Sequence, residues 1–445
     1  MKRQITVFLL IIVFLFSGCD NQITANDNLN NPANLITPSA TQYAIETVTP
    51  TTTQTQVITA APVPENPKYI FIIIGDGMGQ GAASLGEMYV RIGSGDMDAS
   101  AVWENFPHQM IVGAMKDSSS GGTALATGCQ SKQGYISLNL DQEPLYTIMD
   151  RAKEAGMSTG VITNSFLSDA TPATFITHTL SRYDYALLAS QTAEGNVDFM
   201  AGGGLRYFGG KEQASQLPEE DCYGIELSYS GSANLLPQLL ECGYNLYYGY
   251  EGAQILSERV RNDEYPYEKC IYSLSSSYIP WEIDKYDAKK SEDFNNVPTL
   301  CEMTEAGIGN LCQNPNGFVI MVEEAFIDRA AHMSSTIRAI YQMKLLNETM
   351  QVIMDFYYEH PDETLVILTA DHETGGYLYN EELFNKFKEL PDFQWSDSGD
   401  ELSEFLKSQW GFYGFESYYY QQIENSKSDV WENQEDAGAQ LFADI

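Results

Sequence analysis

The chain has 445 residues, of which 43% are hydrophobic, so it can bury a large core and wholesale disorder is excluded. Lysine and arginine number 24, and aspartate and glutamate number 61, which gives a formal net charge of 24 − 61 = −37. Phosphate backbones and anionic membrane surfaces are bound through clustered basic residues. This charge therefore argues against nucleic acid as a partner and against electrostatic adhesion to a membrane.

The first 19 residues predict a processing signal. Lys2 and Arg3 precede an apolar run over residues 5–16, which is shorter than the roughly 20 residues of a membrane span. Residues 15–19, LFSGC, resemble a bacterial lipoprotein cleavage box, although Phe16 stands where leucine is usual. We therefore expect an exported lipoprotein that is anchored to a membrane through a lipid on Cys19. The alternative is an ordinary cleaved signal peptide with an incidental cysteine.

Residues 20–67 are rich in Asn, Thr, Gln, Pro and Ala and carry almost no charge. Such a segment cannot bury enough apolar surface to offset the entropy of ordering it. The composition predicts a disordered tether with a reach of about 40 Å, and the folded domain is expected over residues 68–445.

From residue 68 onward, apolar strands alternate with helical patterns. Residues 69–74 form a continuous apolar run, which is typical of a strand buried on both faces of a parallel sheet. Helices are expected over residues 145–155 and 325–357, and further strands over residues 110–115, 158–163, 197–201, 318–322 and 364–369. The pattern predicts an α/β fold, a three-layer sandwich with a mostly parallel central sheet. Ligands in such sheets bind beyond the carboxyl ends of the strands.

Two polar positions follow the first two predicted strands. Asp76 lies between glycines in residues 75–79, GDGMG, where the backbone can turn tightly towards a ligand; a plain Asp-Gly turn is the alternative. Ser118 follows Asp117 and begins a helical stretch, so its hydroxyl is expected at a helix N-terminus that favours an anion. A serine nucleophile needs activation, and without a Ser-His-Asp pattern a metal must lower its pKa. The alternative is a serine-rich helix cap.

The remaining candidates combine carboxylates with two of the chain's five histidines. Glu323 ends a buried strand, and Asp328 and His332 are spaced i, i+4 on a predicted helix, where both can ligate one zinc ion. Asp371 and His372 follow a strand and precede two glycines that permit a sharp turn.

One further segment points to anion binding. Pro172 is expected to begin a helix capped by Thr171, and Arg182 lies about three turns on, where its guanidinium suits phosphate oxygens; an ordinary surface arginine is the alternative.

Taken together, these motifs resemble the alkaline phosphatase family, in the family's order, from about residue 68 to residue 376. The most specific segments are 75–79, 117–124 (DSSSGGTA), 169–173 (DATPA) and 369–376 (TADHETGG). The resemblance implies hydrolysis of phosphate monoesters. In that reaction Ser118 becomes phosphorylated, Arg182 clamps two phosphate oxygens and Asp117 orients the arginine.

The resemblance also implies two zinc ions and one magnesium ion. Aspartate at position 169, in place of histidine, fits the magnesium-preferring version of the family. The implied ligands are Asp371 and His372 for the zinc next to the serine, Asp328 and His332 for the other zinc, Asp76 as a bridge between the serine-side zinc and magnesium, and Asp169, Thr171 and Glu323 for magnesium.

The sequence departs from the family at one ligand. The family normally supplies another zinc-ligating histidine near its C-terminus, whereas this chain has no histidine after His372. Asp436 resembles the replaced position and is our preferred ligand, with Asp400 as the alternative. A degenerate site with one weak metal position would give a catalytically impaired homologue that binds phosphate or metal at the cell surface. A phosphodiesterase of the same superfamily is a further alternative.

Two features remain open in the sequence. Residues 378–435 are acidic and aromatic and are expected to form an insertion over the mouth of the site. The sequence does not choose between a role in substrate access and a homodimer contact. Among the cysteines, Cys222, Cys242 and Cys270 are the disulfide candidates. Cys301 and Cys312 flank a predicted helix about 16 Å long, too far apart for a bridge, and are expected as core thiols.

Overall fold

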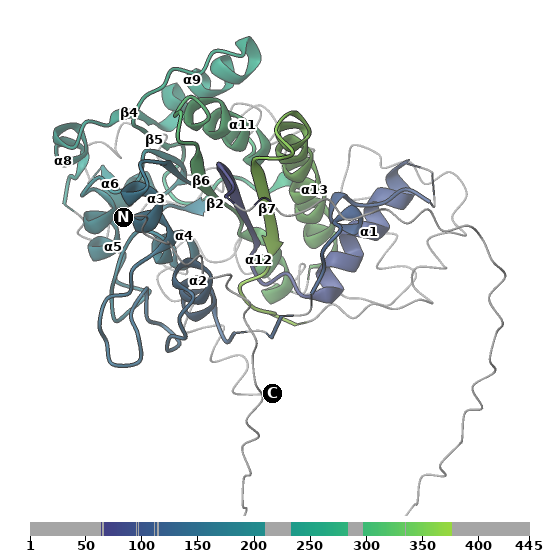
Figure 1. Ribbon diagram of the computed structural model, residues 1–445. Helices are drawn as coiled ribbons and strands as arrows, with labels where there is room; N and C mark the ends of the chain where they lie inside the picture. The colour runs from purple at the N-terminus through teal and green to yellow at the C-terminus, as the bar shows by residue number, and fades with distance from the viewer. Residues whose placement is uncertain are drawn as a thin grey trace, which may run out of the picture. The chain divides into compact units, whose positions relative to one another are not determined.

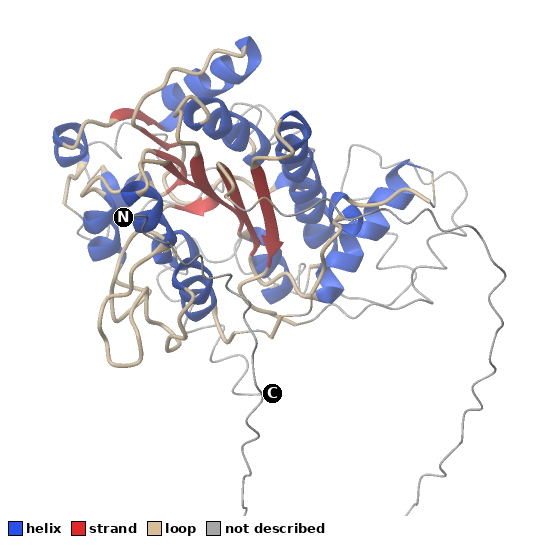
Figure 2. Cartoon of the chain, viewed as in Figure 1, coloured by secondary structure: helices blue, strands red, loops and turns tan. Residues whose placement is uncertain are grey.

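The computed structural model describes residue 64 and residues 66–375, except positions 95, 97, 111, 114, 210–232, 284–296 and 334. In this part of the chain, seven parallel strands form one sheet in the order β4-β5-β3-β2-β6-β1-β7, with helices on both faces (Figures 1 and 2). The predicted three-layer α/β sandwich is confirmed. The strands are β1 (Tyr69–Gly75), β2 (Ser158–Phe166), β3 (Phe199–Gly203), β4 (Asn245–Tyr248), β5 (Cys270–Ser273), β6 (Phe318–Glu324) and β7 (Thr364–Thr369).

The apolar run of β1 packs into both helical layers because alternate side chains of a strand point to opposite faces of a sheet. Phe71 and Ile73 enter one core cluster, and Ile72 and Ile74 enter the other. The first cluster involves helices α1 (Gln80–Ser94), α9 (Gly249–Asn262), α11 (Leu300–Leu311) and α13 (Thr336–Glu359). The second involves helices α2 (Ser118–Thr127), α3 (Ile148–Glu154), α5 (Tyr185–Thr192) and α8 (Leu236–Glu241).

Shorter helices follow the carboxyl ends of central strands, where the predicted ligand-binding positions lie. They are α4 (Ala170–Thr174) after β2, α6 (Leu205–Phe208) after β3 and α12 (Phe326–His332) after β6; a 3-10 helix, η1 (Val102–Asn105), follows α1. Because all seven strands run in parallel, these connections meet at one edge of the sheet, which brings together residues far apart in the sequence.

Several predicted elements differ from the structure. The strand expected over residues 110–115 is not formed in its described residues: Met110 and Val112 are exposed, and Met115 makes only an isolated parallel bridge to His372. The helix expected over 325–357 is two helices, α12 and α13, since Ser335 before α13 has extended backbone angles. Strands β4 and β5 were not predicted, because each has only four residues.

The cysteine prediction is half right. Cys301 and Cys312 pack against the core, as expected. Cys242 and Cys270 are free thiols, which contradicts their assignment as disulfide candidates, while Cys222 lies outside the described residues. Cys270 is buried within β5, and its side chain packs in the first core cluster.

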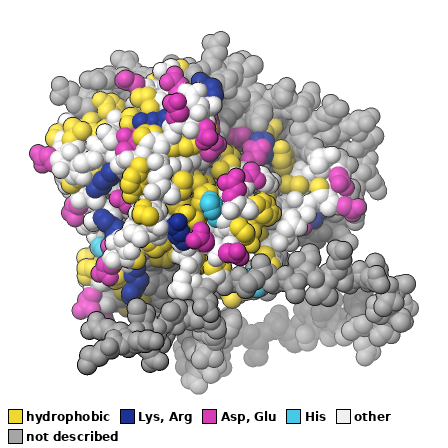
Figure 3. Space-filling view, turned by 45° about the horizontal axis from the view of Figure 1, so that its top comes forward, with side chains coloured by type: hydrophobic (Ala, Val, Ile, Leu, Met, Phe, Trp, Pro, Cys, Tyr) yellow, Lys and Arg dark blue, Asp and Glu magenta, His cyan; other side chains and the backbone are white. Residues whose placement is uncertain are grey.

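Acidic and basic side chains are interspersed on the face that Figure 3 shows. Within the described residues, no helix is both long and apolar enough to cross a membrane. The predicted signal peptide, the 378–435 insertion and the tether, except for residues 64, 66 and 67 at its end, lie outside the described residues.

Candidate metal centre

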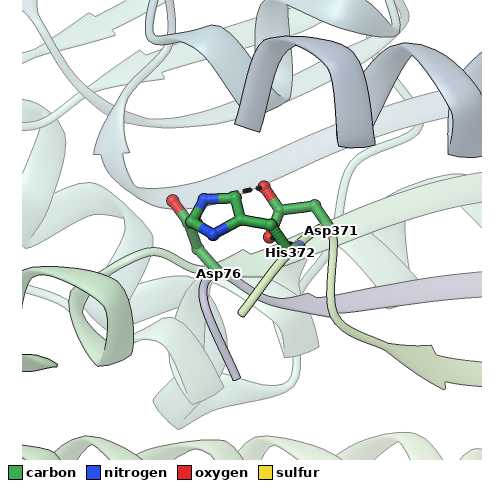
Figure 4. A group of neighbouring side chains, drawn as sticks. All are labelled: Asp76, Asp371 and His372. Atoms are coloured by element: carbon green, nitrogen blue, oxygen red, sulfur yellow. Dashed lines mark hydrogen bonds and ion pairs between the residues drawn. The ribbon is translucent and has the colours of Figure 1, made fainter. Parts of the chain in front are cut away.

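Asp76, Asp371 and His372 form a buried cluster at the ends of two neighbouring strands, β1 and β7 (Figure 4). One ligand atom from each residue lies within 4.8 Å of the other two. His372 Nε2 is 3.2 Å from Asp76 Oδ1 and 3.9 Å from Asp371 Oδ2. Two carboxylates and an imidazole in this arrangement are a ligand set suited to a divalent cation.

Gly77 lets the turn after β1 approach this cluster. Its φ of 63° lies in the left-handed region, and its amide donates a 3.2 Å hydrogen bond to Asp371 Oδ1. A side chain at this position would overlap Thr374 and Asp328. The glycine that the sequence motif places beside Asp76 is therefore required both by the backbone conformation and by the close packing.

Ser118 is the first residue of α2 and lies against the cluster. Its Oγ is 3.2 Å from His372 Nε2 and 3.4 Å from Asp76 Oδ1, and the residue is only 3% exposed. Asp117 caps the helix by accepting a 3.0 Å bond from the Ser120 amide. The predicted helix N-terminus at Ser118 is confirmed. The fold brings Ser118 and His372 into contact although they lie far apart in the sequence.

Arg182 lies in a loop rather than on a helix continuing from Pro172, because α4 ends at Thr174. Its guanidinium is 3.5 Å from Asp117 and 3.8 Å from Asp169. Burial alone would lower the pKa of Arg182, but the two carboxylates raise it, so the charge is retained. Hydrogen bonds from Ser119 and Ser120 outweigh burial and lower the pKa of Asp117. The arginine is held as a cation against Asp117, the residue that precedes Ser118.

The three residues predicted for magnesium lie near one another. Asp169, not Thr171, caps α4, which begins at Ala170. Glu323 is 1% exposed and accepts hydrogen bonds from Thr163 and Thr171. Burial, reinforced by the charge of Asp169, raises the pKa of Glu323 to about 8. A cation bound here would favour the ionised form.

Two contacts of this region were not anticipated from the sequence. Thr163 lies opposite Glu323 in the parallel register between β2 and β6. Arg329, on α12, lies 3.6 Å from Asp169 and donates a 2.6 Å hydrogen bond to the Tyr278 hydroxyl. Arg329 stands beside the predicted ligand Asp328, but no sequence spacing connects it with Asp169.

Asp328 and His332 face the same way on α12, as the i, i+4 spacing predicts. His332 Nε2 is 3.4 Å from Asp328 Oδ2, and 61% of the histidine side chain is exposed. Asp328 also accepts a hydrogen bond from the Thr374 hydroxyl. Asp436 and Asp400, the two candidates for a third ligand, lie outside the described residues.

The electrostatics of the cluster fit a bound cation. Burial raises the pKa of Asp76 well above its ordinary value, and the nearby charges of Asp371 and Asp328 raise it further. Burial lowers the pKa of His372, but hydrogen bonding to Asp76 and the neighbouring carboxylates raise it overall to about 10. Asp371 Oδ2 is buried and accepts no hydrogen bond within the described chain. A divalent cation would both use this oxygen and relieve the repulsion among the carboxylates.

Fold and site together define a class: an α/β protein that presents a buried serine next to a cation-binding cluster at the carboxyl edge of a parallel sheet. Within that class, the chain belongs to the alkaline phosphatase family, whose family model matches residues 67–441.

The chain is 27% identical over 352 residues to the alkaline phosphatase of Schizosaccharomyces pombe, covering 74% of this chain and 60% of that protein. It thus spans less than two thirds of that relative's length. Among solved structures, it is similar to the cold-active alkaline phosphatase of a psychrophilic Shewanella species, with 28% identity and a TM-score of 0.53, covering 71% of this chain and 73% of that chain. It also matches the fold of a mutant TAB5 alkaline phosphatase with Mg bound in its M3 site, with 22% identity and a TM-score of 0.54, covering 71% and 80% of the two chains.

Proposed function

We propose that this protein hydrolyses phosphate monoesters through a phosphoserine intermediate on Ser118. The observation that carries the proposal is the position of Ser118 Oγ, 3.2 Å from His372 Nε2 within the buried cluster and at the N-terminus of α2. The free amides of that helix end favour a phosphoryl group, and membership of the alkaline phosphatase family supports the same chemistry.

The chain's own groups would bind and orient the substrate. Arg182, held between Asp117 and Asp169, offers a planar fork of N–H donors that matches two phosphate oxygens. Burial of Ser118 limits competition from bulk water. Phosphoryl transfer depends mainly on positioning and charge stabilisation, so the site needs little acid–base chemistry from side chains.

We assign two zinc ions and one magnesium ion to the site. Asp371 and His372 would hold the serine-side zinc, Asp328 and His332 the second zinc, and Asp169, Thr171 and Glu323 the magnesium, with Asp76 as a further ligand available to the first zinc and to the magnesium. When bound, these ions supply Lewis-acid stabilisation of phosphoryl oxygens and lower the pKa of the serine hydroxyl and of water. The cluster geometry and the orphaned oxygen of Asp371 support a cation at the first of these positions.

Substitution of the nucleophile tests the proposal. Ser118→Ala should abolish turnover of a chromogenic phosphomonoester while the protein still binds inorganic phosphate, since Arg182 and the helix amides remain. Ser84→Ala, on α1, is the matched control and should behave like the wild type. Near-wild-type turnover by Ser118→Ala would sink the nucleophile assignment.

We further propose that the chain is exported and anchored by a lipid on Cys19. The support is the sequence of residues 1–67 alone: a basic start, a short apolar run, a cleavage-box pattern and a polar tether. Cys19→Ser should release the protein from membranes, and a chain beginning near Pro67 should keep its activity. Retention of Cys19→Ser in the membrane fraction would contradict the anchor. Residues 378–435 are our candidate for an insertion that either controls substrate access or makes a homodimer contact, and sedimentation of chains with and without that segment would test the contact.

A further inference from the structure

A second buried acid, Glu324, lies directly after the predicted ligand Glu323. Glu324 is 0% exposed, and because neighbouring side chains of a strand alternate, it points to the opposite face of the sheet from Glu323. None of the roles described above uses this carboxylate. An ionisable group in so buried a position needs partners that hold it.

The partners of Glu324 come from two other elements. Its Oε1 accepts hydrogen bonds from the Asn164 amide of β2 and, at 2.6 Å, from the Gln342 amide of α13. Both partners are themselves buried, with exposures of 1% and 0%. Gln342 Oε1 in turn accepts a 3.0 Å hydrogen bond from the backbone of Glu282. The network therefore connects the end of β6, the end of β2 and the first half of α13.

The same network caps the start of α12. The N-cap residue of this helix is Ala325, whose side chain cannot accept a hydrogen bond. Glu324 Oε2 accepts a 3.0 Å bond from the Ile327 amide, and Asn164 Oδ1 accepts a 2.7 Å bond from the Ala325 amide. These two side chains satisfy amides that an α-helix leaves free at its N-terminus.

The direction in which α12 leaves the sheet decides where its functional side chains lie. Asp328 follows Ile327 directly, and its side chain packs so closely against Gly77 that a Cβ atom at that glycine would overlap it. The backbone oxygen of Glu324 also accepts a 3.0 Å hydrogen bond from the amide of Asp76. Glu324 thus contacts both the strand end that carries Asp76 and the helix that carries Asp328.

We propose that Glu324 is a positioning residue for the metal centre: through Asn164, Gln342 and the Ile327 amide, it fixes the start of α12 and so holds Asp328 and His332 in place to bind a cation. This inference rests on the proposed function, since it concerns the second zinc position. Residues that orient ligands from outside the coordination sphere typically change metal affinity by about 10- to 100-fold when replaced. Because Glu324 acts through the backbone of α12, we expect the lower end of that range.

Glu324→Gln is the sharpest variant because it keeps the shape of the side chain. One carboxylate oxygen becomes an amide donor that must face either the Ile327 amide or the two amide donors of Asn164 and Gln342. Metal-free full-length protein is titrated with Co²⁺. Calorimetry and the visible absorption of the bound ion follow the binding of each successive Co²⁺ ion. We expect the Co²⁺ ion at the Asp328/His332 position to bind about tenfold more weakly. The affinity for the Co²⁺ ion next to Ser118 should change little.

Two further variants separate positioning from general stability. Glu324→Gln combined with Gln342→Glu returns a carboxylate acceptor to the network and should recover part of the lost affinity. Thr349→Val is the matched control, since Thr349 is also buried on α13 but its hydroxyl lies outside the Glu324 network: it donates to Leu345 O at 2.8 Å and lies 3.3 Å from the Cys301 thiol of α11. It should lower the unfolding midpoint without weakening Co²⁺ binding. If Glu324→Gln does not fold, Gln342→Met removes one donor from the network and serves the same test.

The proposal would be overturned if folded Glu324→Gln bound both Co²⁺ ions with wild-type affinity. A weakening that the Gln342→Glu change does not reduce at all would also overturn it. The proposed phosphatase activity fails separately, if Ser118→Ala turns over substrate normally, because Co²⁺ binding is measured without substrate.

Discussion

Ser118 Oγ lies 3.2 Å from His372 Nε2, although 254 residues separate the two in the sequence. The contact depends on how closely α2 approaches the segment after β7. Gly121, one turn into α2, faces the backbone of Asp371 with no room for a side chain between them. The glycine therefore sets the distance between the proposed nucleophile and the proposed ligands.

Gly121→Ala should consequently disturb both folding and activity. The added methyl group overlaps the carbonyl of Asp371, and such overpacking against backbone costs about 1–3 kcal/mol of unfolding free energy. We expect a lower thermal midpoint and reduced kcat, measured by calorimetry and by a phosphomonoester assay. Gly113→Ala is the control, since a methyl group there meets nothing within 4 Å. Equal behaviour of the two variants would show that the close approach is unimportant.

Arg182→Lys should weaken phosphate binding. Arg182 reaches both Asp117 and Asp169, whereas a lysine ammonium is a point charge that cannot present two parallel donors. A hydrogen bond to a charged group contributes about 1.5–3 kcal/mol, so inhibition by inorganic phosphate should weaken about tenfold or more. The measurement is the phosphate inhibition constant, with the exposed Arg151→Lys as control. An unchanged phosphate inhibition constant would show that Arg182 does not bind phosphate.

The stability of the metal-free protein should fall as pH rises from about 5 to 8. Burial and Asp169 raise the pKa of Glu323 from an ordinary 4.5 to about 8, so in this window the folded state keeps a proton that the unfolded state has lost. Stability then decreases with pH, since the native state binds more protons. Chemical denaturation at several pH values measures this slope. It should be shallower in Glu323→Gln and reduced by added Mg²⁺; an identical slope in Glu323→Gln would contradict the assignment.

Asp436→Ala should weaken metal at the Asp328/His332 position and leave the serine-side ion in place. Only two protein ligands would remain there, and zinc sites usually have at least three. Asp436→His should raise zinc affinity, because imidazole is a good zinc ligand. Metal content after dialysis measures both effects, with Asp400→Ala as the comparison. If Asp400→Ala strips the metal and Asp436→Ala does not, the C-terminal ligand is misplaced.

Much of the architecture could be predicted because it follows from local patterns of residue type and spacing in the sequence. The apolar run over residues 69–74 predicts a strand with two buried faces, and the structure places its alternate side chains in two separate core clusters. The i, i+4 spacing of Asp328 and His332 predicts a shared helical face, and α12 provides it. These features depend only on the 2.0 and 3.6 residue periods of strands and helices.

Other features were decided by tertiary structure alone. Strand order places β1 between β6 and β7, both of which come about 250 or more residues later in the chain, and this order brings Asp76 to His372. The contact of Arg329 with Asp169 and the network around Glu324 also join separate elements. No local spacing of residues in the sequence predicts them. Sequence periodicity determines which face of an element is buried. Which charged groups meet at the sheet edge follows from how the elements pack, because burying carboxylates is favourable only where the neighbouring elements supply donors or a cation.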